Sequence, residues 1–185
     1  MMSIMTALSL AGAAGLNAYI PLLVFGLLAR CTDLVDLPPE WLWLTHPVLL
    51  GVVAALLVVE LVADKIPVVD SVNDVIQTVV RPTSGGIVFA SGLGAAEVVD
   101  GRTEINWVAV IAGVLIALAI HLLKSTARPV VNASTAGVGA PVLSTVEDTT
   151  SLTVTLLALL APGIAAALMV AAVAALGVLG VRRIR

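Results

Sequence analysis

The strongest constraint on this chain is a long uncharged segment near its C-terminus. Residues 149–181 carry no charged side chain, and the run closes at Arg182-Arg183-Ile184-Arg185. Roughly 20 apolar residues are enough to cross a lipid bilayer. Across the whole chain 60% of the residues are hydrophobic and 11% are charged, whereas soluble domains average roughly 25% charged residues. The sequence therefore predicts an integral membrane protein.

Composition also narrows the classes of function. A net charge of −3 without a basic stripe argues against a nucleic-acid partner. Cys31 is the one cysteine, and His46 and His121 lie far apart, so the sequence predicts neither a metal nor a cofactor. It contains no HExxH or Walker pattern and no Ser/His/Asp order. We therefore do not expect an enzyme.

Apolar stretches separated by charged residues set the expected architecture. They cover residues 4–29, 43–63, 84–99, 105–123, 130–146 and 151–181. Pro162-Gly163 should kink or break the last stretch. Lys and Arg gather in the connections on one side, which the positive-inside rule makes cytoplasmic, and Glu147-Asp148 then falls in an outer loop. We expect an all-α bundle of six membrane segments in one domain, residues 1–185, with both termini in the cytoplasm.

Two stretches, 84–99 and 130–146, are short and rich in glycine, which leaves a second architecture open. Four full spans would then be joined by two re-entrant hairpins, since irregular backbone is tolerated at membrane depth only inside protein or beside water. Both stretches follow an Arg-Pro dipeptide, Arg81-Pro82 or Arg128-Pro129. This similarity indicates an internal repeat, although small-residue membrane helices also resemble one another by composition.

A first group of polar residues lies between the second and third stretches. Glu60 and Asp64 are four residues apart and share a helix face, and an ionisable group in so apolar a segment normally faces a cavity or a partner. Residues 66–82 predict an amphipathic helix on the cytoplasmic side. Its polar stripe is either solvated at the membrane surface or lines a pathway, and its members are Asp70, Asn73, Asp74, Gln77 and Arg81.

A second group follows in the fourth stretch. His121, Lys124 and Arg128 recur at spacings of three and four residues and share a face, and Asn132 follows toward the next stretch. His121 is the side chain that changes protonation near neutral pH when unperturbed, which suits a proton relay, although a histidine near a span end is more often a headgroup-level or packing residue. The positive-inside rule by itself also accounts for the cations.

The residues after the first Arg-Pro dipeptide have the composition of an anion site. Free backbone N–H groups at a helix start beside an arginine favour phosphate or carboxylate. The run from Arg81 through Ser84 to Gly86 offers such a start. In this interpretation Glu60 and Asp64 exchange protons, and the anion is held by the cations Lys65, Arg81, Lys124 and Arg128.

Three sequence blocks resemble a known family. They are Ala14-Gly15-Leu16-Asn17-Ala18-Tyr19, the run from Ala63 through Asp74, and Arg81-Pro82-Thr83-Ser84-Gly85-Gly86. Together they are similar to the bacterial membrane-protein family called "domain of unknown function 4126", over nearly the whole chain. The resemblance implies a bacterial membrane protein and assigns no activity to particular residues, and we expect the protein in the inner membrane.

These observations lead to one main hypothesis and two alternatives. The main hypothesis is a small transporter, coupled to protons, for an anionic solute or an anionic phospholipid headgroup, and its small size suggests a homo-oligomer in the lipid bilayer. The alternatives are an ion channel and a lipid-binding or scaffolding protein that transports nothing. The expected pathway residues are Glu60, Asp64, Lys65, Asp70, Asn73, Asp74, Arg81, Ser84, His121, Lys124, Arg128 and Asn132.

Overall fold

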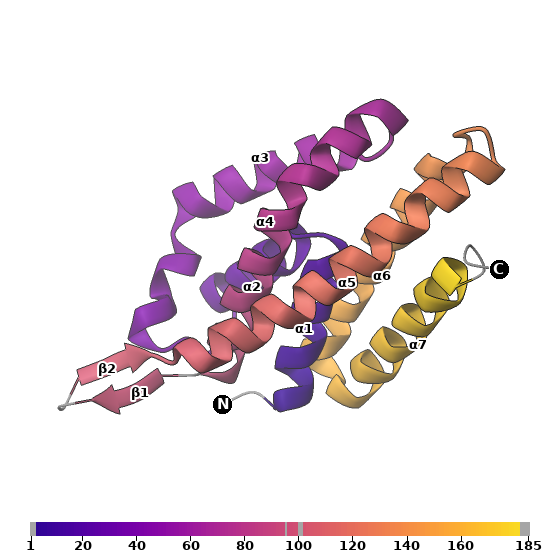
Figure 1. The fold of residues 1–185 in the computed structure, drawn as a ribbon. Helices are drawn as coiled ribbons and strands as arrows, with labels where there is room; N and C mark the ends of the chain where they lie inside the picture. The colour runs from indigo at the N-terminus through magenta and orange to yellow at the C-terminus, as the bar shows by residue number, and fades with distance from the viewer. Residues whose placement is uncertain (1–2, 95, 100–101, 182–185) are drawn as a thin grey trace.

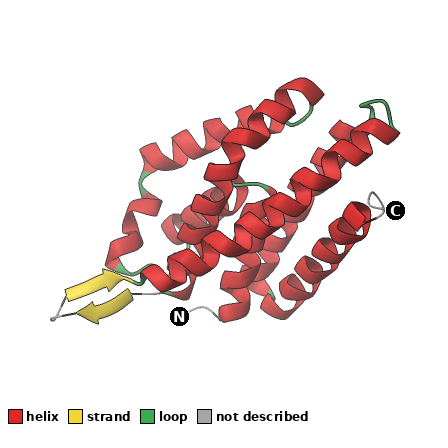
Figure 2. Cartoon of the chain, in the orientation of Figure 1, coloured by secondary structure: helices red, strands yellow, loops and turns green. Residues whose placement is uncertain are grey.

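Helices make up almost all of this protein (Figure 1; Figure 2). The computed structural model describes residues 3–94, 96–99 and 102–181. The expected all-helical fold is confirmed, with one short antiparallel hairpin added to it. In chain order the elements are α1 (Ile4–Leu16), α2 (Tyr19–Cys31), the 3-10 helix η1 (Pro39–Thr45), α3 (Pro47–Ala63), α4 (Pro67–Leu93), β1 (Ala96–Val99), β2 (Arg102–Ile105), α5 (Trp107–Ser134), α6 (Gly139–Leu160) and α7 (Pro162–Val181).

The short first helix, α1, lies at the centre of the bundle. Its sequence is dominated by small residues, and every side chain from Ser9 to Leu16 is buried. It packs against α4, α5, α6 and α7, which lie around it in Figure 1. Small side chains let neighbouring helices approach closely. The composition of α1 therefore suits a helix with neighbours on several sides.

Helices α4 and α5 form the most extensive helix pair, and glycines bring their backbones together. A Cβ on Gly85 would overlap the side chain of Ala117. A Cβ on Gly86 would lie 2.8 Å from a methyl carbon of Val114, and one on Gly113 would overlap the carbonyl oxygen of Gly85. The crossing of the two helices therefore needs glycine at these positions.

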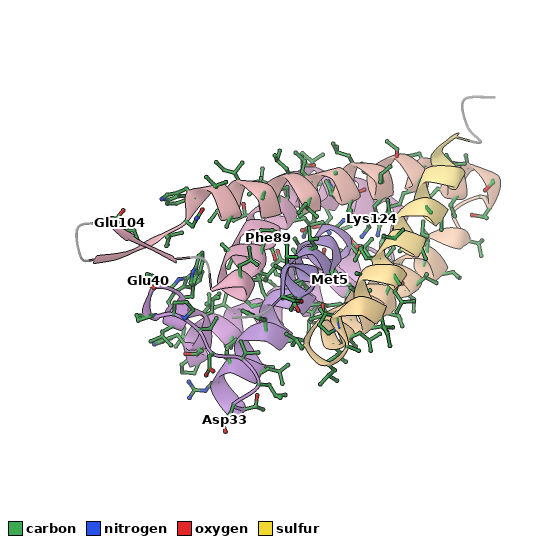
Figure 3. The ribbon with its side chains drawn as sticks, turned by 90° about the horizontal axis from the view of Figure 1, so that it is seen from below. Met5, Asp33, Glu40, Phe89, Glu104 and Lys124 are labelled. Atoms are coloured by element: carbon green, nitrogen blue, oxygen red, sulfur yellow. The ribbon has the colours of Figure 1, made fainter. Side chains whose placement is uncertain are left out.

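Large apolar side chains cover the outside of the bundle, whereas charged ones lie inside. On α4 the valine face points outward, and Val75 is 72% exposed. On the opposite face of the same helix Arg81 is 0% exposed, as is Lys124 of α5. Figure 3 shows Lys124 among the helices, whereas Asp33 and Glu104 lie at the periphery. The amphipathic pattern of residues 66–82 therefore has its polar stripe toward the interior.

The expected count of six membrane segments is not supported. Within the described residues, α5 alone is long and apolar enough to cross a membrane, and η1 together with α3, bent by 56°, makes a second candidate. The first apolar stretch is divided into α1 and α2, and the last into α6 and α7. The sequence-based count rested on apolar length alone, and it did not show that two of the apolar stretches are divided between two helices. The break expected at Pro162 is confirmed.

The expected boundaries around both Arg-Pro dipeptides are also wrong. Pro82 lies inside α4, so the amphipathic segment 66–82 and most of the stretch 84–99 form one helix that ends at Gly94, where φ is 59°. Pro129 lies inside α5, and the stretch 130–146 contains the turn between α5 and α6. The two halves of the expected internal repeat therefore differ in their secondary structure.

The connection expected between the third and fourth stretches is the hairpin of β1 and β2. Its strands pair in antiparallel register from Ala96 with Ile105 to Val99 with Arg102, and Figure 2 shows it projecting from one end of the bundle. It fixes the distance between the end of α4 and the start of α5. The side chain of Asn106 then begins α5 by accepting a hydrogen bond from the N–H of Ala109.

Candidate functional site

Seven charged side chains from four elements meet inside the bundle, and we call them the charge cluster. Asp64, which follows the last residue of α3, is its centre. Its Oδ2 atom lies 3.0 Å from Arg128 Nη2, 3.5 Å from Lys124 Nζ and 3.5 Å from Arg81 Nη2. Its Oδ1 atom accepts a hydrogen bond of 2.8 Å from Asn73. The cluster consists of Glu60, Asp64, Asp74, Arg81, Lys124, Arg128 and Glu147.

Helical spacing explains how α4 and α5 supply the cations. Arg81 lies seven residues after Asp74, and Arg128 lies seven after His121, so each pair shares a helix face. The Nη2 atom of Arg81 donates to Glu60 Oε1 at 2.9 Å, and its Nη1 atom lies 3.9 Å from Asp74 Oδ1. Because α4 packs along α5, the two stripes face each other.

Glu147 belongs to this cluster, although the sequence placed it in an outer loop. Glu147 and Asp148 lie inside α6, and both side chains are buried. Glu147 Oε2 lies 2.6 Å from Arg128 Nη2 and 3.0 Å from Lys124 Nζ. The expected loop is wrong because a buried acidic pair looks like a charged connection when its partners lie elsewhere in the chain.

His121 sits beside the cluster as a neutral side chain. Its Nδ1 atom lies 3.2 Å from Arg81 Nη1, and its Nε2 atom lies 3.1 Å from Thr78 Oγ1. A guanidinium group can only donate hydrogen bonds, so Nδ1 must be the acceptor and the ring proton is on Nε2. Thr78 in turn donates to the carbonyl oxygen of Asp74. A second proton on Nδ1 would displace Arg81, which disfavours His121 as a relay in this arrangement.

The break between α1 and α2 is tied directly to the cluster. Asn17 Oδ1 accepts from the N–H groups of Tyr19 and Ile20, and its Nδ2 atom donates to Asp148 Oδ1 at 2.9 Å. On the other side of the break, Lys124 Nζ donates to the carbonyl oxygen of Leu16 at 2.8 Å. A cation at the C-terminal end of a helix is favourable because it meets free carbonyl groups.

We predict that Asn17→Ala lowers the free energy of unfolding by about 2 kcal/mol, because two N–H groups of α2 lose their acceptor and Asp148 loses a donor. Unfolding in urea, followed by circular dichroism of the reconstituted protein, measures this. Ser3→Ala removes an ordinary N-cap from α1 and is the control, with an expected loss of about 1 kcal/mol. Equal losses for the two variants would contradict the role given to Asn17.

The structure brings most of the predicted pathway residues together. Lys65, however, is exposed in the turn after α3 and donates to the carbonyl oxygen of Leu61 in that helix. Ser84 donates to the carbonyl oxygen of Ala18, and the Oδ1 atom of Asn132 has no hydrogen-bond partner among the described residues. The side chain of Asp70 lies outside the described residues. Those that meet in or against the cluster are Glu60, Asp64, Asn73, Asp74, Arg81, His121, Lys124 and Arg128.

The run from Arg81 to Gly86 does not form the expected helix start. These residues lie in the middle of α4, where backbone N–H groups bond within the helix. The expected cradle of free N–H groups is therefore wrong. Within the described part of the chain, no group of three or more His, Cys, Asp or Glu side chains is placed to hold a metal ion.

Carboxylates outnumber cations in the described part of the cluster. Among the described side chains it holds four carboxylates and three cations. Glu60 Oε2 and Glu147 Oε1 are buried and have no hydrogen-bond partner in the described part of the chain. Burial tends to raise the pKa of Asp64, but the charges of Lys124, Arg128 and Arg81 outweigh it and lower that pKa to about 2. Asp64 is therefore ionised at neutral pH.

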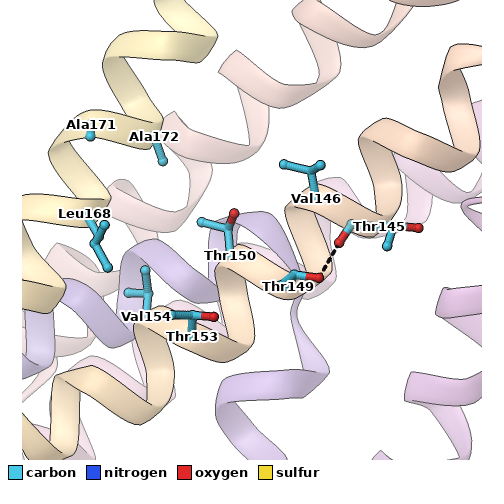
Figure 4. Close-up of a pocket in the computed structure, with 9 residues that line it drawn as sticks. All are labelled: Thr145, Val146, Thr149, Thr150, Thr153, Val154, Leu168, Ala171 and Ala172. Atoms are coloured by element: carbon cyan, nitrogen blue, oxygen red, sulfur yellow. Dashed lines mark hydrogen bonds between the residues drawn. The ribbon is translucent and has the colours of Figure 1, made fainter.

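Two pockets lie where α6 faces α7, on one side of the cluster. The larger, of about 440 Å³, is lined by Thr145, Thr149 and Leu168 among others (Figure 4). Thr149 donates to the carbonyl oxygen of Thr145, so its hydroxyl proton is already used. The smaller, of about 180 Å³, shares part of this lining and includes Glu147 and Leu16. The pockets between α6 and α7 therefore reach the edge of the charge cluster.

Comparison with known proteins relates this architecture to one family. A family model described as "Domain of unknown function (DUF4126)" matches residues 4–183, a region that contains every member of the charge cluster. Searches of the curated proteins and of the solved structures find no match. The resemblance noted in the sequence blocks is thus confirmed, and the chain belongs to the family of domain of unknown function 4126.

Proposed function

We propose that this chain is a small membrane transporter whose charge cluster exchanges protons during transport. The observation that supports the proposal most is the inverted distribution of side chains, with Val and Leu outside and Arg, Lys and carboxylates inside. Soluble monomers rarely expose large contiguous apolar surfaces. Ionisable groups enclosed in an apolar bundle typically mark ion or proton routes.

The arrangement favours a carrier over an open pore. Arg81 and Lys124 are 0% exposed, and each is held by carboxylates, so the centre of the cluster is enclosed, while Asp74 at its edge is 17% exposed. The helical segment is interrupted at Asn17, beside this cluster. Broken helices whose ends meet polar groups at the centre of the protein are a recurrent feature of secondary transporters.

The proposal includes a multi-pass arrangement in a bacterial inner membrane with cytoplasmic termini. In it, α5 makes a full crossing, and η1 with α3 makes a bent one. The pair α1–α2 acts as a broken crossing, since it is interrupted by a single short break, whereas α6 and α7 pack against each other and act as a helical hairpin. Backbone irregularity of this kind is tolerated in membranes where the break is enclosed by protein.

Within the cluster we assign the exchanging proton to Glu60 rather than to Asp64. Glu60 has one cation within hydrogen-bonding distance, Arg81, and its Oε2 atom is buried without a partner among the described residues. An anionic solute fits this site less well, because Arg81, Lys124 and Arg128 already face carboxylates. Anion binding would first require protonation of these carboxylates.

Proton movement in liposomes tests the proposal. The purified protein is reconstituted with an internal pH-sensitive dye, and gradients of inorganic phosphate, acetate, choline and tetraphenylphosphonium are applied in turn. We expect at least one gradient to change the internal pH. Glu60→Gln should slow that change by about tenfold or more, because a proton-transfer step loses its acceptor.

Glu104→Gln is the matched control, because Glu104 is exposed on the hairpin and should leave the rate unchanged. Rates equal to those of empty liposomes for every gradient would overturn the transporter proposal. Proton movement that is identical in wild type and Glu60→Gln would overturn the assignment to Glu60. A tightly held phospholipid in native mass spectrometry, together with no flux, would favour a lipid-binding protein instead.

A further inference from the structure

A second acidic site lies on the other face of α6, in a groove shared with α2 and α3. The groove has a volume of about 370 Å³. Its walls are apolar, with Leu23 from α2 and Leu57 and Leu61 from α3. On the α6 side its lining includes Asp148 and Thr149. It is therefore an apolar groove with one carboxylate in its wall.

The carboxylate of Asp148 has neutral hydrogen-bond donors and no cationic partner among the described residues. It is 9% exposed, and its two oxygens accept from Asn17 Nδ2 at 2.9 Å and from Ser144 Oγ at 3.4 Å. No Lys, Arg or His side chain among the described residues lies within ion-pair distance of it. The preceding residue, Glu147, in contrast lies 2.6 Å from a nitrogen of Arg128. Neutral donors alone compensate a buried carboxylate incompletely.

We propose that this groove binds an amphiphilic organic cation, with its positive centre at Asp148 and its apolar groups along α2 and α3. Charge complementarity indicates a positively charged ligand, because Asp148 repels an anion and a neutral chain leaves its carboxylate unbalanced. The apolar walls indicate an organic ligand, since a divalent metal ion needs several oxygen ligands. A lipophilic cation satisfies both requirements, as ligand sites generally combine apolar walls with a few placed polar groups.

This inference rests on the proposed transporter function and names its solute class. Asn17 connects the groove to the charge cluster. Its amide donates to Asp148 on one side of the α1–α2 break, and on the other side Lys124 donates to the carbonyl oxygen of Leu16. A cation that engages Asp148 competes with the Asn17 amide for the same carboxylate. The break is therefore the element through which an occupied groove would act on the cluster.

Binding of tetraphenylphosphonium to the full chain in nanodiscs of zwitterionic lipid tests the site. Equilibrium dialysis against empty nanodiscs gives the dissociation constant, and tetraphenylborate serves as a probe of the same shape and opposite charge. We expect saturable binding of the phosphonium alone. Asp148→Asn should weaken it by about tenfold or more, a change of about 1.4 kcal/mol or more.

Leu57→Trp fills the groove without altering the carboxylate and should weaken binding to a similar extent, while Asp148→Glu should retain it. Asp33→Asn, at an exposed acidic residue, should bind like wild type. Equal binding of tetraphenylborate, or unchanged binding by both Asp148→Asn and Leu57→Trp, would overturn the proposal. Phosphonium binding at Asp148 without proton flux would overturn the transporter proposal but not the cation site. Proton flux without phosphonium binding would overturn the cation site but not the transporter proposal.

Discussion

Arg81→Met will lower the free energy of unfolding by about 3–5 kcal/mol, because it removes one partner from a buried ion-pair network. Arg81 is fully buried and lies within 4 Å of three carboxylates, those of Glu60, Asp64 and Asp74. Without the guanidinium group, Glu60 keeps its negative charge in an apolar interior or must take up a proton. Urea unfolding of the protein in detergent micelles, followed by circular dichroism, measures the loss.

Two further variants show whether this loss comes from unbalanced charge. Lys65→Met removes an exposed cation that donates to the carbonyl oxygen of Leu61 in α3, and we expect a change within about 0.5 kcal/mol. Adding Glu60→Gln to Arg81→Met should recover part of the stability, because the stranded carboxylate is gone. A double variant that is less stable than Arg81→Met alone would show that lost packing, rather than charge, dominates.

Gly113→Val will separate α4 from α5 and lower the free energy of unfolding by about 3 kcal/mol, near the upper end for overpacked sites. The first carbon of a side chain at this position would overlap the carbonyl oxygen of Gly85 and lie 2.9 Å from the Cα of Gly86. Backbone atoms cannot rotate away as a side chain can, so the whole helix must move. The same unfolding assay measures the effect.

Gly51→Ala provides the matched control for helix glycines. Gly51 lies in α3, and a Cβ there would meet nothing within 4 Å. Because alanine is a better helix former than glycine, the change should stabilise the protein by as much as about 1 kcal/mol. Similar losses for Gly51→Ala and Gly113→Val would contradict the close approach of α4 and α5.

The grouping of charged side chains could largely be predicted from the sequence, because helical periodicity is a local property. The i, i+3, i+7 spacing of His121, Lys124 and Arg128 placed them on one face before any contact was known. The same holds for the polar stripe of α4, whose Gln77 and Arg81 are buried. That these two faces would meet each other depends on packing, which periodicity does not encode.

The burial of Glu147 and Asp148 inside α6 could not be predicted from the local sequence pattern. An acidic pair between a glycine-rich stretch and a long uncharged run has the same composition as a loop. What holds Glu147 inside α6 is Arg128, from a different helix, and what holds Asp148 is Asn17, at the far end of the chain. The sequence did contain one indication of this pairing. Lys124 and Arg128 have no acidic residue in their own helix, so their partners had to come from elsewhere in the chain.

Helix continuity was the other property that could not be predicted. Proline interrupts isolated helices, yet Pro82 and Pro129 lie inside α4 and α5, where the neighbouring helices hold the backbone in place. The break after α1 contains no charged residue, so the apolar stretch looked unbroken. Two signals could have found it: Asn17, since asparagine is a strong helix-capping residue, and Pro21, which lies in the first turn of α2, where proline is tolerated.

The central position of α1 has a consequence for biogenesis. Four helices that pack against it, α4 to α7, are translated after it. Chains are made from the N-terminus onward, so the faces of α1 are covered one after another as these helices emerge. A chain that stalls before α6 therefore leaves uncovered the faces of α1 that α6 and α7 contact in the finished fold.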